Sequence, residues 1–302
     1  MERKGKALTM SVFARRKKEG RKIVVLTAYD LTSALIATAG GVDAILVGDS
    51  LGMVVLGHEN TLPVTVDDMV HHCAAVCRAK PRVPVIADMP YGSFHVSVAE
   101  TVRHGLRLVK ETGVNAVKVE GGRSRAEAIK ALIDAEIPVM GHLGLTPQSV
   151  NRFGGYRVQG RGEDAAAALL DEASFLEEAG CFGMVLECVP ASLAERISSR
   201  LSIPTIGIGA GPGCDGQVLV IHDMLGLFTG LKPKFVKRYA ELGTAAVQAV
   251  ESYVAEVRSG TFPSSEHQYS EDPSGPKDGS ATNVSGQSGY LGSVSGDGEG
   301  SG

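Results

Sequence analysis

Acidic side chains stand at the ends of short apolar runs in this sequence. Asp49 follows the run AILV, Asp88 ends VPVIAD, and Glu120 ends AVKVE. Carboxylates that face one another repel, so a group of them on neighbouring strands needs a positive charge between them. Hard oxygen ligands suit Mg²⁺, which keeps several waters and takes only one or two carboxylates directly. The pattern therefore predicts a magnesium site formed by Asp49, Asp88 and Glu120.

A hydroxyl and a lysine accompany these carboxylates. Ser50 adds a hydroxyl and a backbone N–H beside Asp49, and Lys118 lies two residues before Glu120. Residues two apart in a strand point to the same face, so Lys118 could neutralise an anionic substrate next to the metal. Two structural alternatives stay open. Asp49 could simply cap the following helix, and Lys118 with Glu120 could form a structural ion pair.

A further carboxylate, Glu187, stands in the apolar stretch VLEC. Burial raises the pKa of a carboxyl group and makes it a better base near neutral pH, so Glu187 is the candidate general base. An internal salt bridge is the structural alternative. His142 either lines the same pocket or forms a hydrogen bond at a strand end.

Eight apolar, β-branched runs must position these side chains, and each ends in polar or glycine residues. The runs span residues 22–30, 44–50, 83–90, 116–122, 137–144, 183–190, 203–211 and 217–226. Helical patterns follow, for example at 97–112, 164–179 and 191–200, and 9–20 predicts an N-terminal helix with Thr9 or Ser11 near its cap.

Near-continuous apolar strands that alternate with helices predict a parallel sheet covered on both faces. Eight such units over about 250 residues predict a (βα)8 TIM barrel, with a doubly wound open sheet as the alternative. In a barrel, the polar strand ends converge at the C-terminal face. This ring would contain Asp30, Asp49, Ser50, Asp88, Lys118, Glu120, His142, Glu187, His222 and Asp223.

Composition excludes several other classes of protein. A net charge of −4 over 302 residues argues against a nucleic-acid partner. Five cysteines, an odd number at scattered spacing, favour a reducing, cytoplasmic compartment over a disulfide framework. No apolar run in the sequence approaches the roughly 20 residues of a spanning helix, so we expect no membrane association.

The chain changes character near its C-terminal end. Residues 264–302 are dominated by Ser and Gly and contain few aliphatic residues. Such a segment cannot bury enough apolar area to offset its chain entropy, which predicts a disordered tail. We therefore expect one catalytic domain at 1–263, including the N-terminal helix, and a disordered tail at 264–302.

Two other motifs receive structural interpretations. The stretch from His71 to Cys77 has the residue types of a zinc site, but Cys73 and Cys77 have helical i, i+4 spacing and a second ligand pair at the expected spacing is missing. The stretch IGIGAGPGCDG resembles a phosphate-binding glycine loop but lacks the Lys-Ser/Thr that follows a P-loop.

Several longer phrases together resemble the 3-methyl-2-oxobutanoate (ketopantoate) hydroxymethyltransferase family, over about residues 11–262. They are LTAYD (26–30), LVGDSLGMVVLGHENTLPVT (46–65), ADMPYGSF (87–94), VKVEGG (117–122), GHLGLTPQSVNRFGGYRVQGR (141–161), LECVP (186–190) and IGIGAGPGCDGQVLVIHDMLG (206–226). The resemblance implies a (βα)8 barrel that transfers a one-carbon unit from 5,10-methylenetetrahydrofolate to 3-methyl-2-oxobutanoate with Mg²⁺, giving 2-dehydropantoate. It also implies a homo-oligomer, commonly a decamer.

The resemblance assigns roles residue by residue. The metal carboxylates fall on Asp49, Asp88 and Glu120, the substrate contacts on Asp49, Ser50, Asp88 and Lys118, and the proton acceptor on Glu187. The stretch after Ser50 is long enough to be a loop that covers the site. Two rival functions remain: a Mg²⁺-dependent lyase or mutase acting on another 2-oxo acid, and a catalytically inactive barrel that serves in binding or assembly.

Overall fold

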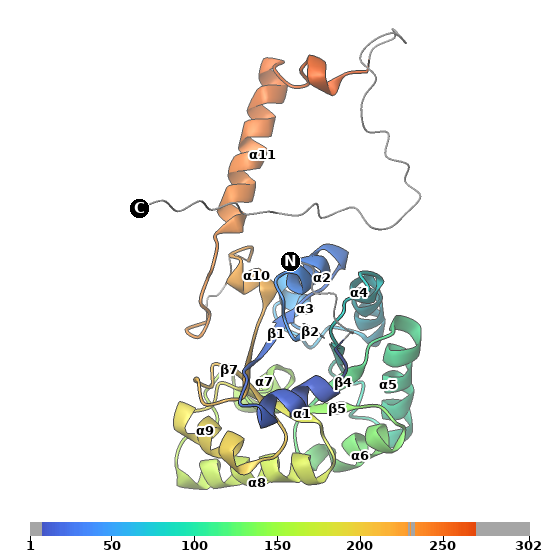
Figure 1. Cartoon of the computed structure of the whole chain (residues 1–302), viewed down its shortest axis with the longest axis vertical. Helices are drawn as coiled ribbons and strands as arrows, with labels where there is room; N and C mark the ends of the chain where they lie inside the picture. Colours follow the sequence, from blue (N-terminus) through green and yellow to red (C-terminus); the bar gives the residue numbers. More distant parts are fainter. Residues whose placement is uncertain (1–7, 229, 231–232, 270–302) are drawn as a thin grey trace. The chain divides into compact units, whose positions relative to one another are not determined.

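Eight parallel strands close into a barrel in sequence order, with β8 paired to β1 (Figure 1). The computed structural model describes residues 8–228, 230 and 233–269. The strands are β1 (Ile23–Thr27), β2 (Ala44–Val47), β3 (Val85–Asp88), β4 (Ala116–Glu120), β5 (Val139–Gly144), β6 (Gly183–Glu187), β7 (Thr205–Ile208) and β8 (Gly216–Leu219). Each coincides with a predicted run, and β8 begins one residue before its run. The (βα)8 barrel is confirmed, because the β1–β8 pairing leaves no open edge.

Helices between successive strands surround the barrel (Figure 1). The described helices are α1 (Ser11–Lys18), α2 (Leu31–Ala39), α3 (Leu51–Val54), α4 (Val66–Arg78), α5 (Val98–Thr112), α6 (Ala126–Asp134), α7 (Val150–Phe153), α8 (Glu163–Glu178), α9 (Ala191–Arg200), α10 (Ile221–Met224) and α11 (Leu242–Ser259), with 3-10 turns η1 (Arg123–Arg125), η2 (Pro147–Ser149) and η3 (Ser265–His267). The surrounding helices include α2, α4, α5, α6, α8 and α9. The predicted helices at 97–112, 164–179 and 191–200 agree with α5, α8 and α9 to within one residue. Asp30 and Thr65 begin α2 and α4 with capping boxes.

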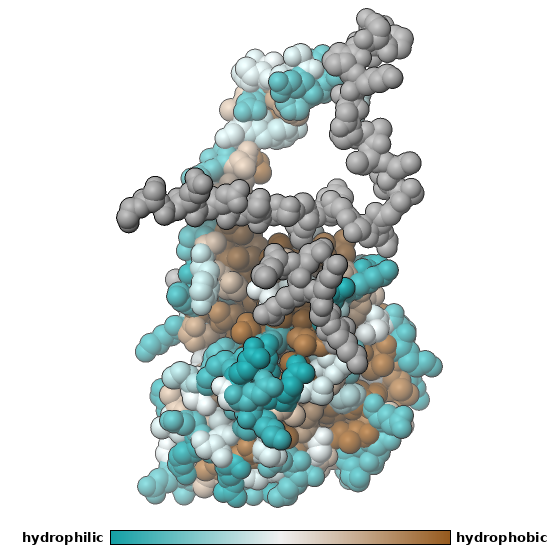
Figure 2. Space-filling model, in the orientation of Figure 1, coloured by the Kyte–Doolittle hydropathy of each residue, from teal (hydrophilic) through white to brown (hydrophobic). Residues whose placement is uncertain are grey.

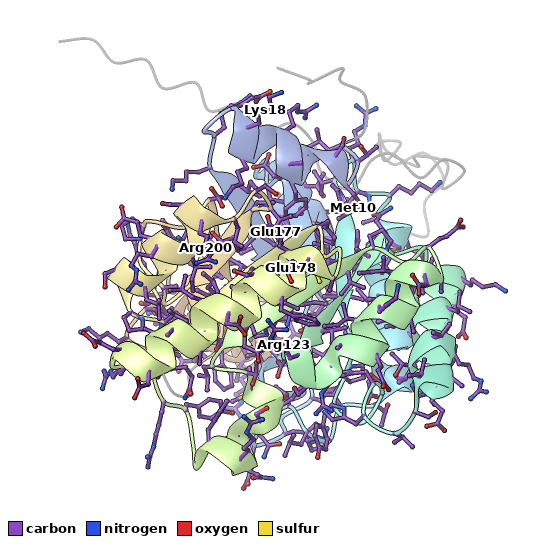
Figure 3. The ribbon with its side chains drawn as sticks, turned by 90° about the horizontal axis from the view of Figure 1, so that it is seen from below. Met10, Lys18, Arg123, Glu177, Glu178 and Arg200 are labelled. Atoms are coloured by element: carbon purple, nitrogen blue, oxygen red, sulfur yellow. The ribbon has the colours of Figure 1, made fainter. Side chains whose placement is uncertain are left out.

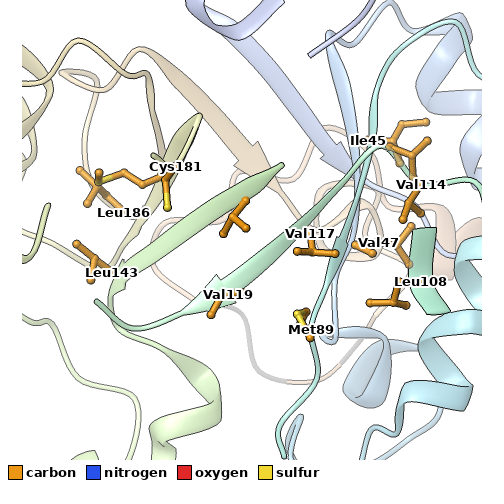
Figure 4. Packing of buried hydrophobic residues seen from close by; sticks show 14 of the residues in the cluster. Ile45, Val47, Met89, Leu108, Val114, Val117, Val119, Leu143, Cys181 and Leu186 are labelled. Atoms are coloured by element: carbon orange, nitrogen blue, oxygen red, sulfur yellow. The ribbon is translucent and has the colours of Figure 1, made fainter. Parts of the chain in front are cut away.

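Alternation along the strands separates two layers of packing. In β4, Ala116 joins the cluster inside the barrel, whereas Val117 and Val119 join the larger cluster that includes the helices (Figure 4). Side chains of a strand point alternately to opposite faces, so Lys118 and Glu120 follow Ala116 into the barrel interior. The strand pattern alone therefore directs these two charged residues inward.

Helix α1 packs against the barrel's N-terminal end. Its Val12 and Phe13 are buried in the interior cluster, and the Phe13 ring lies 5.2 Å from that of Phe182 in an edge-to-face arrangement. Lys17 forms an ion pair of 2.7 Å with Asp215, which precedes β8. Figure 3 labels Met10 and Lys18 at the ends of this helix.

Thr9 and Ser11 flank the N-cap position of α1, as the sequence predicted. Met10 is the N-cap residue, and neither neighbouring hydroxyl caps the helix, because Thr9 Oγ1 and Ser11 Oγ form a hydrogen bond with each other.

The chain divides into two compact units, Met1–Val247 and Gln248–Gly302. In the second unit the described residues, 248–269, contain the remainder of α11 and the turn η3. Most of the predicted tail, 270–302, lies outside the described residues, and a domain boundary at 263 stays a prediction.

Figure 2 shows apolar as well as hydrophilic surface on the face in view. None of the described helices is long and apolar enough to cross a membrane.

Removing the Phe13 ring should destabilise the barrel from its N-terminal end. Phe13→Ala deletes a fully buried aromatic side chain, which costs about 3–5 kcal/mol of unfolding free energy. Urea denaturation measures this loss. Val96→Ala, at a side chain that is 75 % exposed, is the control and should change stability by less than about 0.5 kcal/mol. Equal effects of the two substitutions would contradict the interior role of Phe13.

Candidate active site

Three buried carboxylates meet at the C-terminal ends of neighbouring strands. Asp88 ends β3, Glu120 ends β4, and Asp49 lies two residues beyond β2. Their exposed fractions are 4 %, 6 % and 3 %. The Asp49 backbone N–H donates a hydrogen bond of 3.1 Å to Asp88 Oδ2. The structure thus brings together the three residues that the sequence predicts as metal ligands.

The electrostatics of this cluster is dominated by burial and by mutual repulsion. Burial, followed by the charges of Asp88 and Glu120, raises the pKa of Asp49 well above its ordinary value. Burial and the charge of Asp88 raise the pKa of Glu120 to about 7, against the opposing effect of Lys118. The cluster is therefore short of positive charge, which is the condition that favours binding a cation.

Lys118 provides positive charge within the cluster. Its Nζ lies 3.1 Å from Asp88 Oδ1, and the pairing register places Lys118 directly beside Asp88. Burial alone would lower the pKa of Lys118, but the charges of Asp88, Glu120 and Asp49 outweigh it and raise that pKa, so the amine is protonated. Lys118 thus forms its ion pair with Asp88, and not with Glu120, the partner considered from the sequence.

The carboxylate oxygens of the cluster match the ligands of a hard metal ion. Among the described residues, no three His, Cys, Asp or Glu side chains are already arranged as a metal cage. The chemistry nevertheless suits Mg²⁺, because the cluster offers hard carboxylate oxygens, and Asp49 and Glu120 have raised pKa values. Mg²⁺ needs only one or two carboxylates beside its waters. Asp88 Oδ1 also accepts no hydrogen bond of good geometry, although Lys118 lies near it.

His142 connects the carboxylate cluster to Glu187. Its imidazole is 2 % exposed, with Nδ1 3.0 Å from Lys118 Nζ and Nε2 3.3 Å from Glu187 Oε2. An ammonium group can only donate, so Nδ1 is the acceptor and the proton of the neutral ring sits on Nε2, facing Glu187. Burial and the charge of Lys118 lower the pKa of His142, which keeps the ring neutral. His142 therefore lines the site, one of the two interpretations left open.

The backbone around Glu187 requires a glycine. Gly144, at the end of β5, has φ +90°, and a Cβ there would lie 2.2 Å from the Glu187 carbonyl oxygen. The next residue of that loop, Leu145, donates its N–H to the same oxygen at 2.8 Å. A side chain at 144 would thus push β6 away and displace Glu187.

Ser50 lies at the edge of the cluster and bonds to a residue that the sequence did not single out. Its Oγ is 2.8 Å from the Tyr29 hydroxyl, and burial raises the pKa of Tyr29, which keeps the phenol protonated. Helix α3 begins after Ser50, so Asp49 is not its cap residue; the Asp49 side chain accepts a hydrogen bond from Gln148 instead. The capping interpretation of Asp49 is therefore wrong.

Gln148 is the principal site residue that sequence reasoning missed. It lies in η2, it is 5 % exposed, and it bonds to both Asp49 and Glu120. Its place in GHLGLTPQS, just after the fifth strand, is the signal that could have found it, because the loops after barrel strands form the site.

Other polar residues near the strand ends have structural roles. The Asp30 carboxylate accepts the Ser33 N–H as the cap of α2, and the His222 ring packs 5.4 Å from that of Tyr29. Cys73 is buried in the core.

The predicted covering loop after Ser50 starts with the short helix α3 and continues irregularly to the cap of α4 at Thr65.

A closed (βα)8 barrel with a buried polar cluster at its C-terminal strand ends defines a TIM-barrel enzyme. The sequence model described as "Ketopantoate hydroxymethyltransferase" matches residues 7–265. The chain belongs to this ketopantoate hydroxymethyltransferase family, a family of enzymes.

Curated relatives agree with this membership. The protein of Syntrophus aciditrophicus is 54 % identical over 266 residues, covering 88 % of this chain and 98 % of the relative, and that of Nitratidesulfovibrio vulgaris is 57 % identical over 255 residues, covering 84 % and 83 %. Both carry the name 3-methyl-2-oxobutanoate hydroxymethyltransferase.

Solved structures of other enzymes share the fold. A phosphonopyruvate hydrolase in complex with oxalate and Mg²⁺ has a TM-score of 0.57 at 12 % identity and covers 86 % of this chain and 93 % of its own. A 2,3-dimethylmalate lyase has a TM-score of 0.54 at 18 % identity, covering 87 % and 92 %. At these identities the likeness concerns the barrel alone.

Glu120 should make the metal-free protein lose stability as pH rises. Its folded pKa of about 7 lies above the ordinary 4.5, so the folded state binds more protons than the unfolded state between these values. This stabilisation is full below about pH 4.5 and is lost as pH rises through 7. In Glu120→Gln the decline in unfolding free energy over this range should shrink by up to about 3 kcal/mol.

Urea denaturation at several pH values, in the presence of a chelator, measures this slope. Glu251→Gln, at an exposed position of α11, is the matched control and should keep the wild-type pH dependence. A wild-type slope in Glu120→Gln would contradict the raised pKa.

Proposed function

We propose that this enzyme transfers a hydroxymethyl group from 5,10-methylenetetrahydrofolate to 3-methyl-2-oxobutanoate, giving 2-dehydropantoate in pantothenate and coenzyme A biosynthesis. The name shared by relatives at 54–57 % identity supports this reaction. The structural observation that carries it is the buried cluster of Asp49, Asp88 and Glu120, joined through Lys118 and His142 to a separate carboxylate.

The metal site of the proposal consists of Asp49, Asp88 and Glu120. A bound Mg²⁺ would polarise the ketone of the substrate as a Lewis acid and make its C3 proton more acidic. The carboxylates hold the cation at the strand ends, and the raised pKa values of Asp49 and Glu120 reflect the charge it would neutralise. Asp49 and Asp88 also border the keto acid.

Lys118 and Ser50 bind the anionic substrate. The Lys118 ammonium is held between Asp88 and His142, so its position is fixed before substrate arrives. There it can neutralise the substrate carboxylate or the oxygen on which negative charge develops when the proton leaves. Ser50 presents its hydroxyl beside Tyr29 for a hydrogen bond to the same substrate.

Glu187 is the proposed base. Its carboxylate lies across His142 from the cluster and keeps 15 % side-chain exposure, so it can exchange its proton with solvent. It accepts the proton from C3, and His142 Nε2 lies 3.3 Å from its Oε2. The enolate carbon then forms a bond to the methylene carbon of the folate. The two C–N bonds that hold this carbon break, water supplies the product hydroxyl, and the proton from C3 and one from the water end on the two nitrogens of the departing tetrahydrofolate.

Assembly and location belong to the same proposal. Family resemblance supports a homo-oligomer, commonly a decamer. The five free cysteines support a reducing, cytoplasmic compartment. Small molecules, the 2-oxo acid and the folate, are the proposed partners.

A Mg²⁺-dependent lyase or mutase acting on another 2-oxo acid is the second candidate. Two fold neighbours favour it, a phosphonopyruvate hydrolase at 12 % identity and a 2,3-dimethylmalate lyase at 18 % identity. Such lyases often carry a cysteine on a flexible loop. Here Cys214 is buried, and Cys188, beside Glu187, is partly exposed with a thiol pKa raised by burial to about 11.

Dependence on the folate donor separates these two functions. With 3-methyl-2-oxobutanoate, Mg²⁺ and 5,10-methylenetetrahydrofolate, we expect 2-dehydropantoate in ¹³C NMR, with the donor's methylene carbon in the new hydroxymethyl group. Without the donor, we expect no net product. Cleavage or rearrangement of a 2-oxo acid at full rate without folate would favour the lyase or mutase.

The base is tested by exchange of the substrate's C3 proton in D₂O, followed by ¹H NMR. With Mg²⁺ and, if needed, tetrahydrofolate, the wild type should exchange this proton. Glu187→Gln should slow exchange by roughly 10²–10⁴-fold, because the amide cannot accept the proton. The matched control is Glu195→Gln on the exposed face of α9. Near-normal exchange in Glu187→Gln with unchanged keto-acid binding would reject Glu187 as the base.

A further inference from the structure

Gln148 makes contact with the ends of three barrel strands from one buried position. Its side-chain Nε2 donates to Asp49 Oδ2 at 2.8 Å and to the Met89 carbonyl oxygen, just beyond β3, at 2.9 Å. Its backbone N–H donates to Glu120 Oε2 at 3.0 Å. Gln148 thus holds one oxygen of each of two carboxylates, which come from different strands.

These contacts fix the orientation of the carboxamide. Both of its N–H protons point at acceptors that carry no proton to give, a carboxylate and a backbone carbonyl. Exchanging the nitrogen and oxygen would place Oε1 against both acceptors, so the assignment follows from the contacts. The preceding Pro147 restricts the backbone, which makes the turn around Gln148 rigid.

The remaining carbonyl, Gln148 Oε1, is buried and has no hydrogen-bond partner among the described residues. A buried acceptor without a donor is unfavourable, and native proteins rarely keep one without a water or ligand to satisfy it. The water shell of a hard cation held by the neighbouring carboxylates would provide such a donor.

We propose that Gln148 is a positioning residue for the cation site. Its side-chain Nε2–H holds Asp49 Oδ2, and its backbone N–H holds Glu120 Oε2. These bonds leave Asp49 Oδ1 and Glu120 Oε1 for the cation. The free Oε1 of Gln148 accepts a hydrogen bond from a water bound to the cation. The carboxamide does this without adding positive charge that would compete with the metal. Outer partners of this kind orient metal-binding carboxylates. The inference rests on the metal site of the proposed function.

The test measures metal affinity without turnover. Mn²⁺, a hard divalent probe, is titrated into the metal-free full chain, and free Mn²⁺ is followed by electron paramagnetic resonance. Gln148→Met keeps the side-chain length and the backbone donor to Glu120 but removes the two side-chain N–H donors and the acceptor, so Kd should rise 10–100-fold. Gln248→Met, at an exposed position of α11, is the matched control and should keep the wild-type Kd.

A second variant, Gln148→Asn, keeps the test decisive if Gln148→Met misfolds. Gln148→Asn keeps the carboxamide and the backbone donor but is one methylene too short for Asp49, so a smaller rise in Kd is expected. Thermal unfolding without metal reports any purely structural effect, which would lower Tm and leave Kd unchanged. If Gln148→Met does not fold, the Asn variant decides.

The outcomes distinguish this inference from the proposed function. If the wild type binds no Mn²⁺, the metal site itself is wrong. If the wild type binds Mn²⁺, Asp88→Ala does not, and both Gln148 variants bind as the wild type does, the metal site stands and the positioning role of Gln148 is overturned.

Discussion

Like charges confined in a buried space are the constraint on which this site depends. Asp49, Asp88 and Glu120 are each at least 94 % buried, and of the residues that the structure describes only Lys118 places a full positive charge among them. Three carboxylates and one ammonium do not balance, so two of the carboxylates have raised pKa values. This imbalance makes the cluster a place where a cation or a proton is stabilised, and the proposed metal uses it.

The barrel tolerates this charge cluster because the apolar packing that stabilises the fold and the polar residues of the site lie at opposite ends of the strands. Apolar residues fill the interior near the N-terminal strand ends, where Phe13 of α1 closes it. The polar residues occupy the last inward-facing positions at the opposite ends. Because the two regions lie at different ends of the strands, the unfavourable charge cluster is supported by a well-packed layer that takes no part in binding.

Residues of β5 and of the turn that follows it then orient the charged groups. Gln148 holds Asp49 and Glu120, His142 links Lys118 to Glu187, and Gly144 lets β5 approach the backbone of Glu187. Most of these partners are neutral, so they orient the charged groups without cancelling them. His142, Gly144 and Gln148 all belong to the phrase GHLGLTPQS, so this one stretch contributes several residues to the site.

The sequence by itself determined the eight strands and the inward direction of Lys118 and Glu120, because the period of two is a local property. The number of strands predicted a barrel, but only the pairing of β1 with β8 decided its closure over the open sheet. It also placed Asp49, Asp88 and Glu187 at strand ends. Only the tertiary structure decided that Asp49 bonds to Gln148 rather than capping a helix, and that His142 faces Glu187. Those contacts join residues 45 to 99 positions apart, and which side chains meet across such distances depends on the packing of the whole barrel.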